Sequence, residues 1–77
     1  MTIETKVRTT LIDLLELPED FNDTDTFSSF GSDSLDMMEL MMKIEDEFDI
    51  QILDSQVENM VTPRDVINFL TEAMGDK

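Results

Sequence analysis

The absence of both cysteine and histidine constrains this chain of 77 residues more than any other feature of its sequence. Without disulfides or metal ligands of the Cys and His type, a domain this short must be stabilised by apolar packing alone. A hydrophobic fraction of 40% is enough for one small core. Seven methionines indicate either an interior that repacks around guests of different shape or simply a soft core. We therefore expect residues 1–77 to form a single domain.

Apolar residues recur with helical spacing along most of the chain, which predicts four helices. The helices are expected over about residues 2–16, from 33 or 34 to about 49, and after Thr62, with a short third helix that Asp54 or Ser55 caps and that carries Val57 and Met60. Thr62 as N-cap, Pro63 at the first helical position and Asp65 signal the start of the last helix, and Gly75 its stop.

Residues 18–33 lack helical periodicity and are predicted to form a long loop after the first helix. Phe21, Phe27 and Phe30 lie inside this loop, where we expect them to anchor it to the helices. A loop of this length is uncommon in a compact domain unless it positions something. The expected fold is all-α, a small irregular four-helix bundle in which one helix is short.

The charge of the chain limits its partners. Nineteen acidic and five basic residues give a formal net charge of −14, which disfavours nucleic acid and anionic membranes. The acidity indicates either attraction to basic patches on other proteins or simply a soluble surface. No apolar run approaches the length of a membrane span, and no leader segment follows Met1. We expect a cytoplasmic protein that acts as a monomer.

The predicted second helix has two partly apolar faces. One face forms a core stripe of Met37, Leu40, Met41, Ile44 and Phe48. On the opposite side, which also carries Ser34, three large apolar residues stand among acidic ones; they are Leu35, Met38 and Met42 beside Glu39, Glu45, Asp46 and Asp49. This side is either a docking surface or is covered by the long loop or the third helix.

The motif at the start of the second helix places Ser34 where a helix begins, in residues 31–36, GSDSLD. Unpaired N–H groups and the helix dipole favour an anion at such a position, so a phosphate-linked group could be attached there. Ser34 could equally be only the N-cap of the helix. If Asp33 is the cap instead, the Ser34 hydroxyl remains free.

Two rival chemistries fit the sequence poorly. No register of the acidic loop places Asp, Asn, Gly and Glu at the spacing of a calcium-binding EF-hand. Ser34 lacks both a histidine partner and the G-x-S-x-G turn of serine hydrolases. An enzyme acting alone is therefore not expected, nor is a metal site.

The chain resembles the acyl carrier proteins of dissociated fatty-acid and polyketide synthases. The resemblance is carried by residues 30–36, FGSDSLD, by Glu39 and Leu40, and by residues 44–50, IEDEFDI. The length, the acidity, the long first loop and the Val-Thr-Pro entry to the last helix are also similar to those of the family.

The resemblance implies that Ser34 carries 4′-phosphopantetheine, transferred from coenzyme A by a phosphopantetheinyl transferase with Mg²⁺, and that Asp33 supports this modification. The arm ends in a thiol, which would give thioester chemistry to a chain without cysteine. Partner enzymes that transfer acyl groups or elongate chains would dock through basic patches. Together with the helical geometry, the family gives the docking residues as Leu35, Asp36, Met38, Glu39, Met42, Glu45 and Asp46.

Members of this family also shelter growing chains between their helices. Met37, Met41 and Met60 could make such a cavity adaptable, or they could be ordinary core residues. Two other functions remain open: a specialised carrier of aminoacyl or other cargo, and an acidic interaction module that blocks a basic partner without a prosthetic group.

Overall fold

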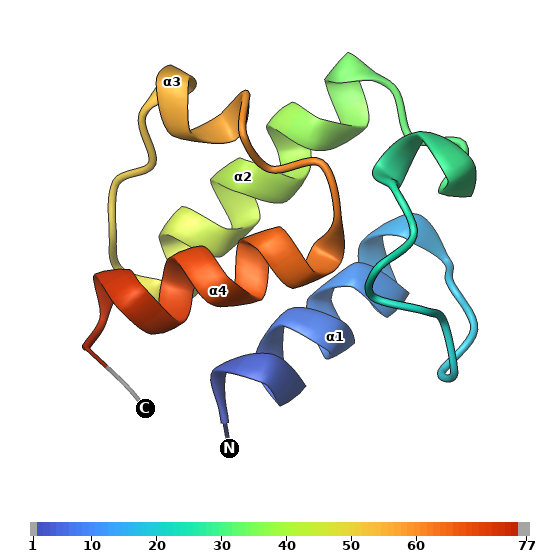
Figure 1. Cartoon of the computed structure of the whole chain (residues 1–77), viewed down its shortest axis with the longest axis horizontal. Coiled ribbons are helices and arrows are strands. Elements are labelled where there is room, and N and C mark those ends of the chain that lie inside the picture. Colours follow the sequence, from blue (N-terminus) through green and yellow to red (C-terminus); the bar gives the residue numbers. More distant parts are fainter. Residues whose placement is uncertain (1, 76–77) are drawn as a thin grey trace.

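The three longest helices of the structure, labelled in Figure 1, are each preceded by a residue whose polar side chain is the N-cap. The computed structural model describes residues 2–75. Its elements follow in the order α1 (Ile3–Leu15), η1 (Phe27–Phe30, a 3₁₀ helix), α2 (Ser34–Phe48), α3 (Asp54–Val57) and α4 (Pro63–Ala73). Thr2, Asp33 and Thr62 each accept a hydrogen bond from the first turn of α1, α2 and α4. The predicted all-α bundle with one short helix is confirmed.

The boundaries of α1 and α3 differ slightly from those predicted. α1 ends at Leu15 because Glu16 adopts the left-handed conformation, with φ of 55°. Leu53, and not Asp54 or Ser55, is the N-cap of α3, and Met60 lies beyond the end of that helix. Leucine cannot cap with its side chain, and instead its N–H donates to Oε1 of Gln56 at 2.9 Å. The sequence does not show that a backbone N–H of the cap residue, and not its side chain, makes this hydrogen bond.

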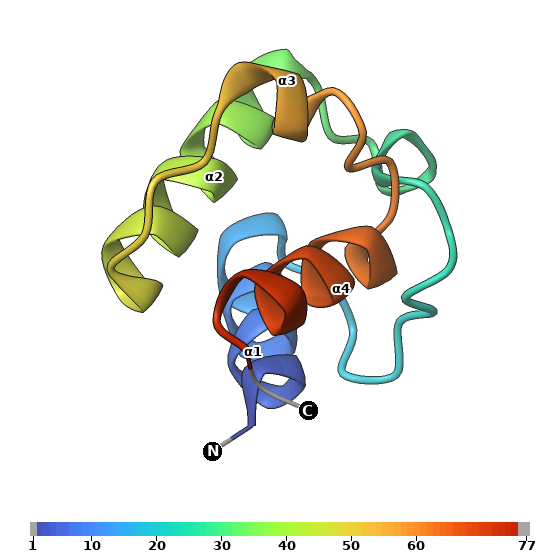
Figure 2. The same ribbon diagram turned by 60° about the vertical axis from the view of Figure 1, so that its left-hand side comes forward.

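α1 packs against both α2 and α4, and these contacts form the core. In Figure 2 α2 lies to the upper left of α1, α4 passes across α1, and the segment with α3 arches above them. The core residues of these three helices are Ile3, Val7, Leu11, Leu40, Met41, Ile44, Phe48, Val66, Ile67 and Leu70. α3 contributes no buried residue. Its position therefore depends on the segments around it.

Two expectations concern the extent of the chain. The prediction of one domain over residues 1–77 includes Met1 and residues 76–77, which lie outside the described residues. Within residues 2–75, no helix combines the length and the apolar character needed to cross a membrane.

The long loop is held to the helices by its three phenylalanines, as predicted. Phe21 and Phe27 are buried and Phe30 is half-buried against the core. The rings of Phe21 and Phe30 meet edge to face with centroids 5.9 Å apart. The N–H of Phe27 donates to the carbonyl of Val61 at 2.9 Å, which joins the loop to the entry of α4.

Arg8 fixes the first half of the loop to α1. Its Nη2 donates to the backbone carbonyls of Glu19 and Phe21, at 2.9 and 3.1 Å. The guanidinium carbon also lies 4.1 Å from the centroid of the Phe21 ring, so the cation covers the aromatic face. One side chain thus satisfies two loop carbonyls and shields a core phenylalanine.

Arg64 fixes the middle of the loop to α4. Its Nη2 pairs with Asp23 of the loop and lies 3.3 Å from Oε1 of Glu4 on α1. The N–H of Arg64 donates to the Asp23 carbonyl at 2.8 Å. Burial lowers the pKa of the guanidinium, but the hydrogen bond to Asp23 and the charges of Asp23 and Glu4 outweigh burial and raise the pKa above its ordinary value.

Replacing Arg64 by glutamine should lower the free energy of unfolding by about 1 kcal/mol, because the loop carboxylate of Asp23 loses its partner. Lys43→Gln removes the same charge from an exposed position of α2 and is the matched control. Urea unfolding of both variants measures the difference. Equal losses in the two variants would mean that net charge, and not the contact with Asp23, determines the effect.

Candidate functional site

Asp33, and not Ser34, is the N-cap of α2. Its carboxylate accepts a hydrogen bond from the Asp36 N–H at 3.0 Å, and the Asp36 carboxylate accepts one from the Asp33 N–H at 3.2 Å. This capping box satisfies backbone N–H groups at the start of α2 without using the Ser34 hydroxyl. Ser34 is the first residue of α2 and is exposed. Of the two arrangements that the sequence left open, the one that frees the Ser34 hydroxyl is present.

The turn before α2 sets the direction from which Ser34 enters the helix. Gly31 has φ of +82°, a left-handed conformation that residues with a Cβ rarely adopt. The N–H groups of Gly31 and Ser32 donate to the carbonyls of Ser28 and Phe27, at 3.0 and 3.2 Å. The end of η1 is thereby closed, and the chain turns directly into the capped start of α2.

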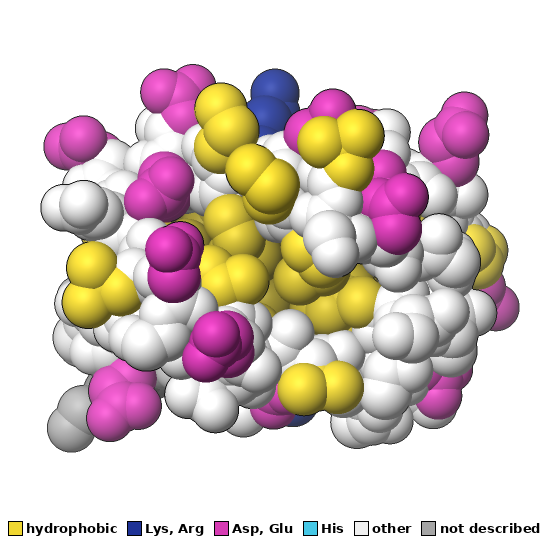
Figure 3. Space-filling view, turned by 90° about the horizontal axis from the view of Figure 1, so that it is seen from above, with side chains coloured by type: hydrophobic (Ala, Val, Ile, Leu, Met, Phe, Trp, Pro, Cys, Tyr) yellow, Lys and Arg dark blue, Asp and Glu magenta, His cyan; other side chains and the backbone are white. Residues whose placement is uncertain are grey.

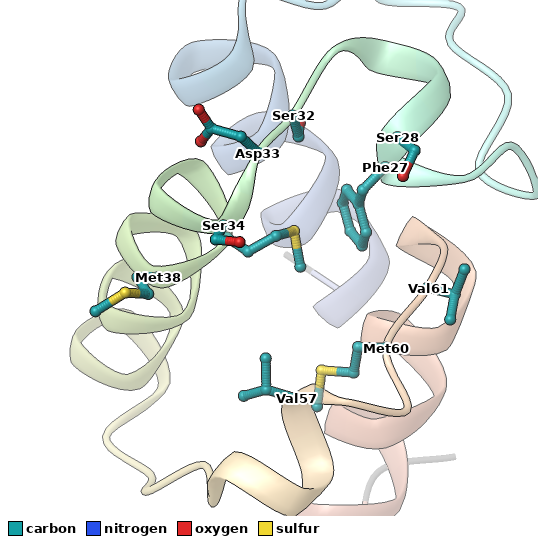
Figure 4. A pocket seen from close by; sticks show the side chains of 10 residues that line it. Phe27, Ser28, Ser32, Asp33, Ser34, Met38, Val57, Met60 and Val61 are labelled. Atoms are coloured by element: carbon teal, nitrogen blue, oxygen red, sulfur yellow. The ribbon is translucent and has the colours of Figure 1, made fainter.

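A cavity of about 600 Å³ opens beside Ser34 (Figure 4). Hydroxyl and carboxyl side chains from residues 28–34 line its upper side in the figure, and Val57 and Met60 line the lower side. Its apolar lining residues are Phe27, Met37, Met38, Val57, Met60 and Val61. The cavity is therefore large enough for a flexible apolar group and adjoins an exposed hydroxyl.

The cavity was only partly visible in the sequence. Met37 and Met60 line it, whereas Met41 is buried in the core instead. Phe27, Val57 and Val61 were not anticipated, because helical periodicity does not show which residues of a loop and a short helix face one space. The one sequence signal for Val61 was its place in the Val-Thr-Pro segment, which predicted that it directly precedes the last helix.

The second face of α2 is open to solvent. Leu35, Met38 and Met42 are 63%, 61% and 65% exposed, so the alternative that the loop or α3 covers them is wrong. Glu39 and Asp46 are exposed on the same helix. Figure 3 shows apolar atoms gathered around a hollow, with acidic side chains around them. We call Leu35, Met38, Glu39, Met42 and Asp46 the α2 face.

Two of the predicted docking residues are engaged within the protein. The Asp36 carboxylate belongs to the capping box, and Oε2 of Glu45 accepts a hydrogen bond from the Ile52 N–H at 2.7 Å. Both side chains are half-buried. Leu53 and Val61 are exposed apolar residues that the sequence did not single out, since neither lies in a predicted amphipathic helix.

These features define a class of protein: a small helical domain with a free serine at a helix start, an adjoining apolar cavity and an acidic face. Comparison with known proteins identifies the family. Residues 5–70 match the family described as "Phosphopantetheine attachment site". The acyl carrier proteins of three strains of Buchnera aphidicola subsp. Acyrthosiphon pisum (Tuc7, 5A and APS) are each 36% identical over 70 residues, 88% of this chain and 88% of each relative.

The chain belongs to the acyl carrier protein family. Its cofactor is 4′-phosphopantetheine, which members of this family hold covalently. The residues present fit such a group, because one hydroxyl at a helix N-terminus takes no part in the capping bonds and opens onto a cavity.

The capping box can be tested separately from any modification. Asp33→Ala should lower the free energy of unfolding by about 1 kcal/mol, because the Asp36 N–H loses its acceptor. Asp20→Ala removes one carboxylate from an exposed loop position and controls for charge. Urea titrations of the unmodified proteins give both values. Unchanged stability in Asp33→Ala would show that α2 does not depend on this cap.

Proposed function

We propose that Ser34 is the residue that carries 4′-phosphopantetheine, and that the protein delivers acyl intermediates as thioesters to enzymes of fatty-acid or polyketide-type biosynthesis. The observation that carries this proposal is the free, exposed hydroxyl of Ser34 in the first turn of α2, beside the cavity. The sequence contains no cysteine, so the thiol that forms a thioester must come from the attached arm.

In the attachment reaction the Ser34 hydroxyl is the nucleophile. Its oxygen forms a new phosphoester bond to the phosphopantetheinyl phosphorus of coenzyme A, its proton passes to the transferase, and 3′,5′-ADP leaves. This chain has no histidine, and the neighbouring Asp33 carboxylate already accepts a hydrogen bond from the Asp36 N–H, so we assign the base to the transferase with its Mg²⁺. The first turn of α2 favours the resulting phosphodiester through its N–H groups and dipole, and Asp33 supports the site by capping that turn.

The cavity beside Ser34 is proposed to shelter the apolar part of the cargo. Met37, Met38 and Met60 have flexible side chains that can adapt to chains of different length. Val57 is the lining residue from α3, a helix without buried residues. α3 itself thus contributes little to the core, whereas Met60, which follows it in the same wall, is buried there.

The α2 face is proposed to dock the transferase and the enzymes that load, extend or remove the acyl group. Glu39 and Asp46 would steer basic patches toward it, and the exposed Leu35, Met38 and Met42 would supply short-range apolar contact. Asp36 and Glu45 are assigned to the same interface in a smaller role, because each already accepts a hydrogen bond from this chain.

We assign the protein the role of a carrier without catalytic residues of its own, in which residues 1–77 act as one domain in the cytoplasm. A net charge of −14 opposes association of two copies, which supports a monomer. The cargo can be an acyl chain of primary or specialised metabolism, and loading assays with candidate enzymes separate these.

Intact mass spectrometry tests the attachment residue. After incubation with coenzyme A, Mg²⁺ and a broad-specificity phosphopantetheinyl transferase, the parent should gain one phosphopantetheinyl group and Ser34→Ala none. Ser29→Ala removes the hydroxyl of another exposed serine nearby and should be modified like the parent. If the folded parent gains no mass while a known carrier does, Ser34 is not an attachment residue and the acidic interaction module becomes the better function.

Reversing charge on the α2 face should slow the modification. In Glu39→Lys/Asp46→Lys, kcat/KM of the transferase should fall about tenfold at low ionic strength, because steering toward basic patches is lost. The loss should shrink as salt is added.

Asp13→Lys/Glu72→Lys makes the same change of charge at exposed positions of α1 and α4 and is the matched control. Circular dichroism verifies that both double variants are folded. Equal loss of kcat/KM in the two variants would remove the docking role from the α2 face and leave only an effect of net charge.

A further inference from the structure

Ser32 has a buried hydroxyl that no group of the protein satisfies. Among the described residues, Ser32 Oγ is the buried side-chain nitrogen or oxygen atom without a hydrogen-bond partner. The backbone of the same residue is engaged, since its N–H donates to the Phe27 carbonyl at 3.2 Å. A buried hydroxyl without a partner costs free energy, so its presence calls for a physical reason.

The local fold does not require this hydroxyl. Asp33 caps α2 and Thr26 caps η1, and Gly31 provides the left-handed turn between them. Alanine at position 32 could adopt the same backbone and would leave no unsatisfied oxygen. The hydroxyl therefore lowers the stability of the unmodified protein, and a hydrogen bond formed after modification can offset this loss.

Ser32 lines the cavity beside Ser34. Figure 4 shows it on the same side as Ser28 and Ser34, across the space from Val57 and Met60. One side of the cavity thus carries serine side chains and the other carries aliphatic and thioether groups, and a guest reaches the covered Ser32 oxygen only by displacing the atoms over it. A guest that fits both sides is an apolar chain with a hydrogen-bonding group along it.

We propose that Ser32 Oγ binds a carbonyl, amide or hydroxyl group of the arm or its cargo, and so selects for loaded groups that place such a polar atom in the cavity. The proposal rests on the attachment at Ser34. Two sources carry this chemistry: the amides of the pantetheine arm, and an oxygen on the acyl chain, such as that of a 3-oxoacyl group. A saturated acyl chain has no such atom beyond its thioester.

Ser32 also lines a smaller, mainly polar cavity of about 200 Å³, together with Phe30, Gly31 and Asp36. A water molecule held there could satisfy the hydroxyl without any guest. The two explanations differ in the unmodified protein. If water already binds Ser32 Oγ, removing the hydroxyl loses a hydrogen bond, whereas removing an unsatisfied hydroxyl loses nothing.

The test compares the parent with Ser32→Ala in four forms: unmodified, carrying the arm alone, and carrying octanoyl or 3-oxooctanoyl groups through a non-hydrolysable amide analogue of coenzyme A. Intact mass verifies each loading, and therefore reports on Ser34 independently of Ser32. Urea unfolding measures the equilibrium constant of unfolding of each form. Ser29→Ala, at an exposed serine that does not line this cavity, is the matched control.

We expect unmodified Ser32→Ala to be at least as stable as the unmodified parent. Loading should then decrease the unfolding constant of the parent about fivefold more than that of Ser32→Ala. A difference already present with the arm alone identifies an arm amide as the partner, and one present only with 3-oxooctanoyl identifies the acyl oxygen. Ser29→Ala should respond to loading like the parent.

Two results would overturn the proposal. One is an equal response of the parent and Ser32→Ala to every loaded group. The other is a loss of stability in unmodified Ser32→Ala, which would show that water or protein already satisfies the hydroxyl. Absence of any mass gain would instead contradict the attachment at Ser34, so the two failures are distinguishable.

Discussion

The reciprocal hydrogen bonds between Asp33 and Asp36 are the contact on which the rest of the site depends. A serine that capped α2 would turn its oxygen toward the N–H groups of the first turn, where it would be occupied by hydrogen bonding. With two aspartates in that role, the Ser34 hydroxyl stands at the positive end of the helix dipole and faces solvent. The capping box thus stabilises the helix and leaves its first hydroxyl available.

The two sides of the cavity beside this serine are fixed to the core by different contacts. Arg8 and Arg64 bind the long loop to α1 and α4, and the loop in turn holds Phe27 in the core. On the other side, α3 is a single short helix without buried residues, and half-buried Val57 is its contribution to the lining. The contacts of α1 with α2 and α4 do not depend on α3, while Ile52 and Met60 join the segments on either side of α3 to the core.

The sequence predicted the helices well because α1, α2 and α4 bury strongly periodic apolar stripes and begin at recognisable caps. It left the role of Ser34 open, since Asp33 and Ser34 are both good caps and only the structure shows which one bonds to Asp36. The sequence did not distinguish Glu45, which accepts a hydrogen bond from the Ile52 N–H, from Glu39, which is exposed. The cavity was least predictable, because three separate segments line it and helical spacing carries no information about their contact.

Three of the five basic residues of this acidic chain contact groups within the protein. Lys6 lies over the ring of Phe48, Arg8 covers Phe21, and Arg64 pairs with Asp23 and Glu4. These three cations shield the core and hold the loop, whereas exposed Lys43 lies beside Glu39, Met42 and Asp46 on α2 and offsets part of the acidic charge there. The remaining negative charge would attract a basic partner in the proposed docking, and that attraction weakens with salt and with distance. Leu35, Met38 and Met42 add apolar contact only after the two surfaces meet. Fast approach through charge and a small apolar contact area together favour the short-lived complexes that a carrier needs in order to visit one enzyme after another.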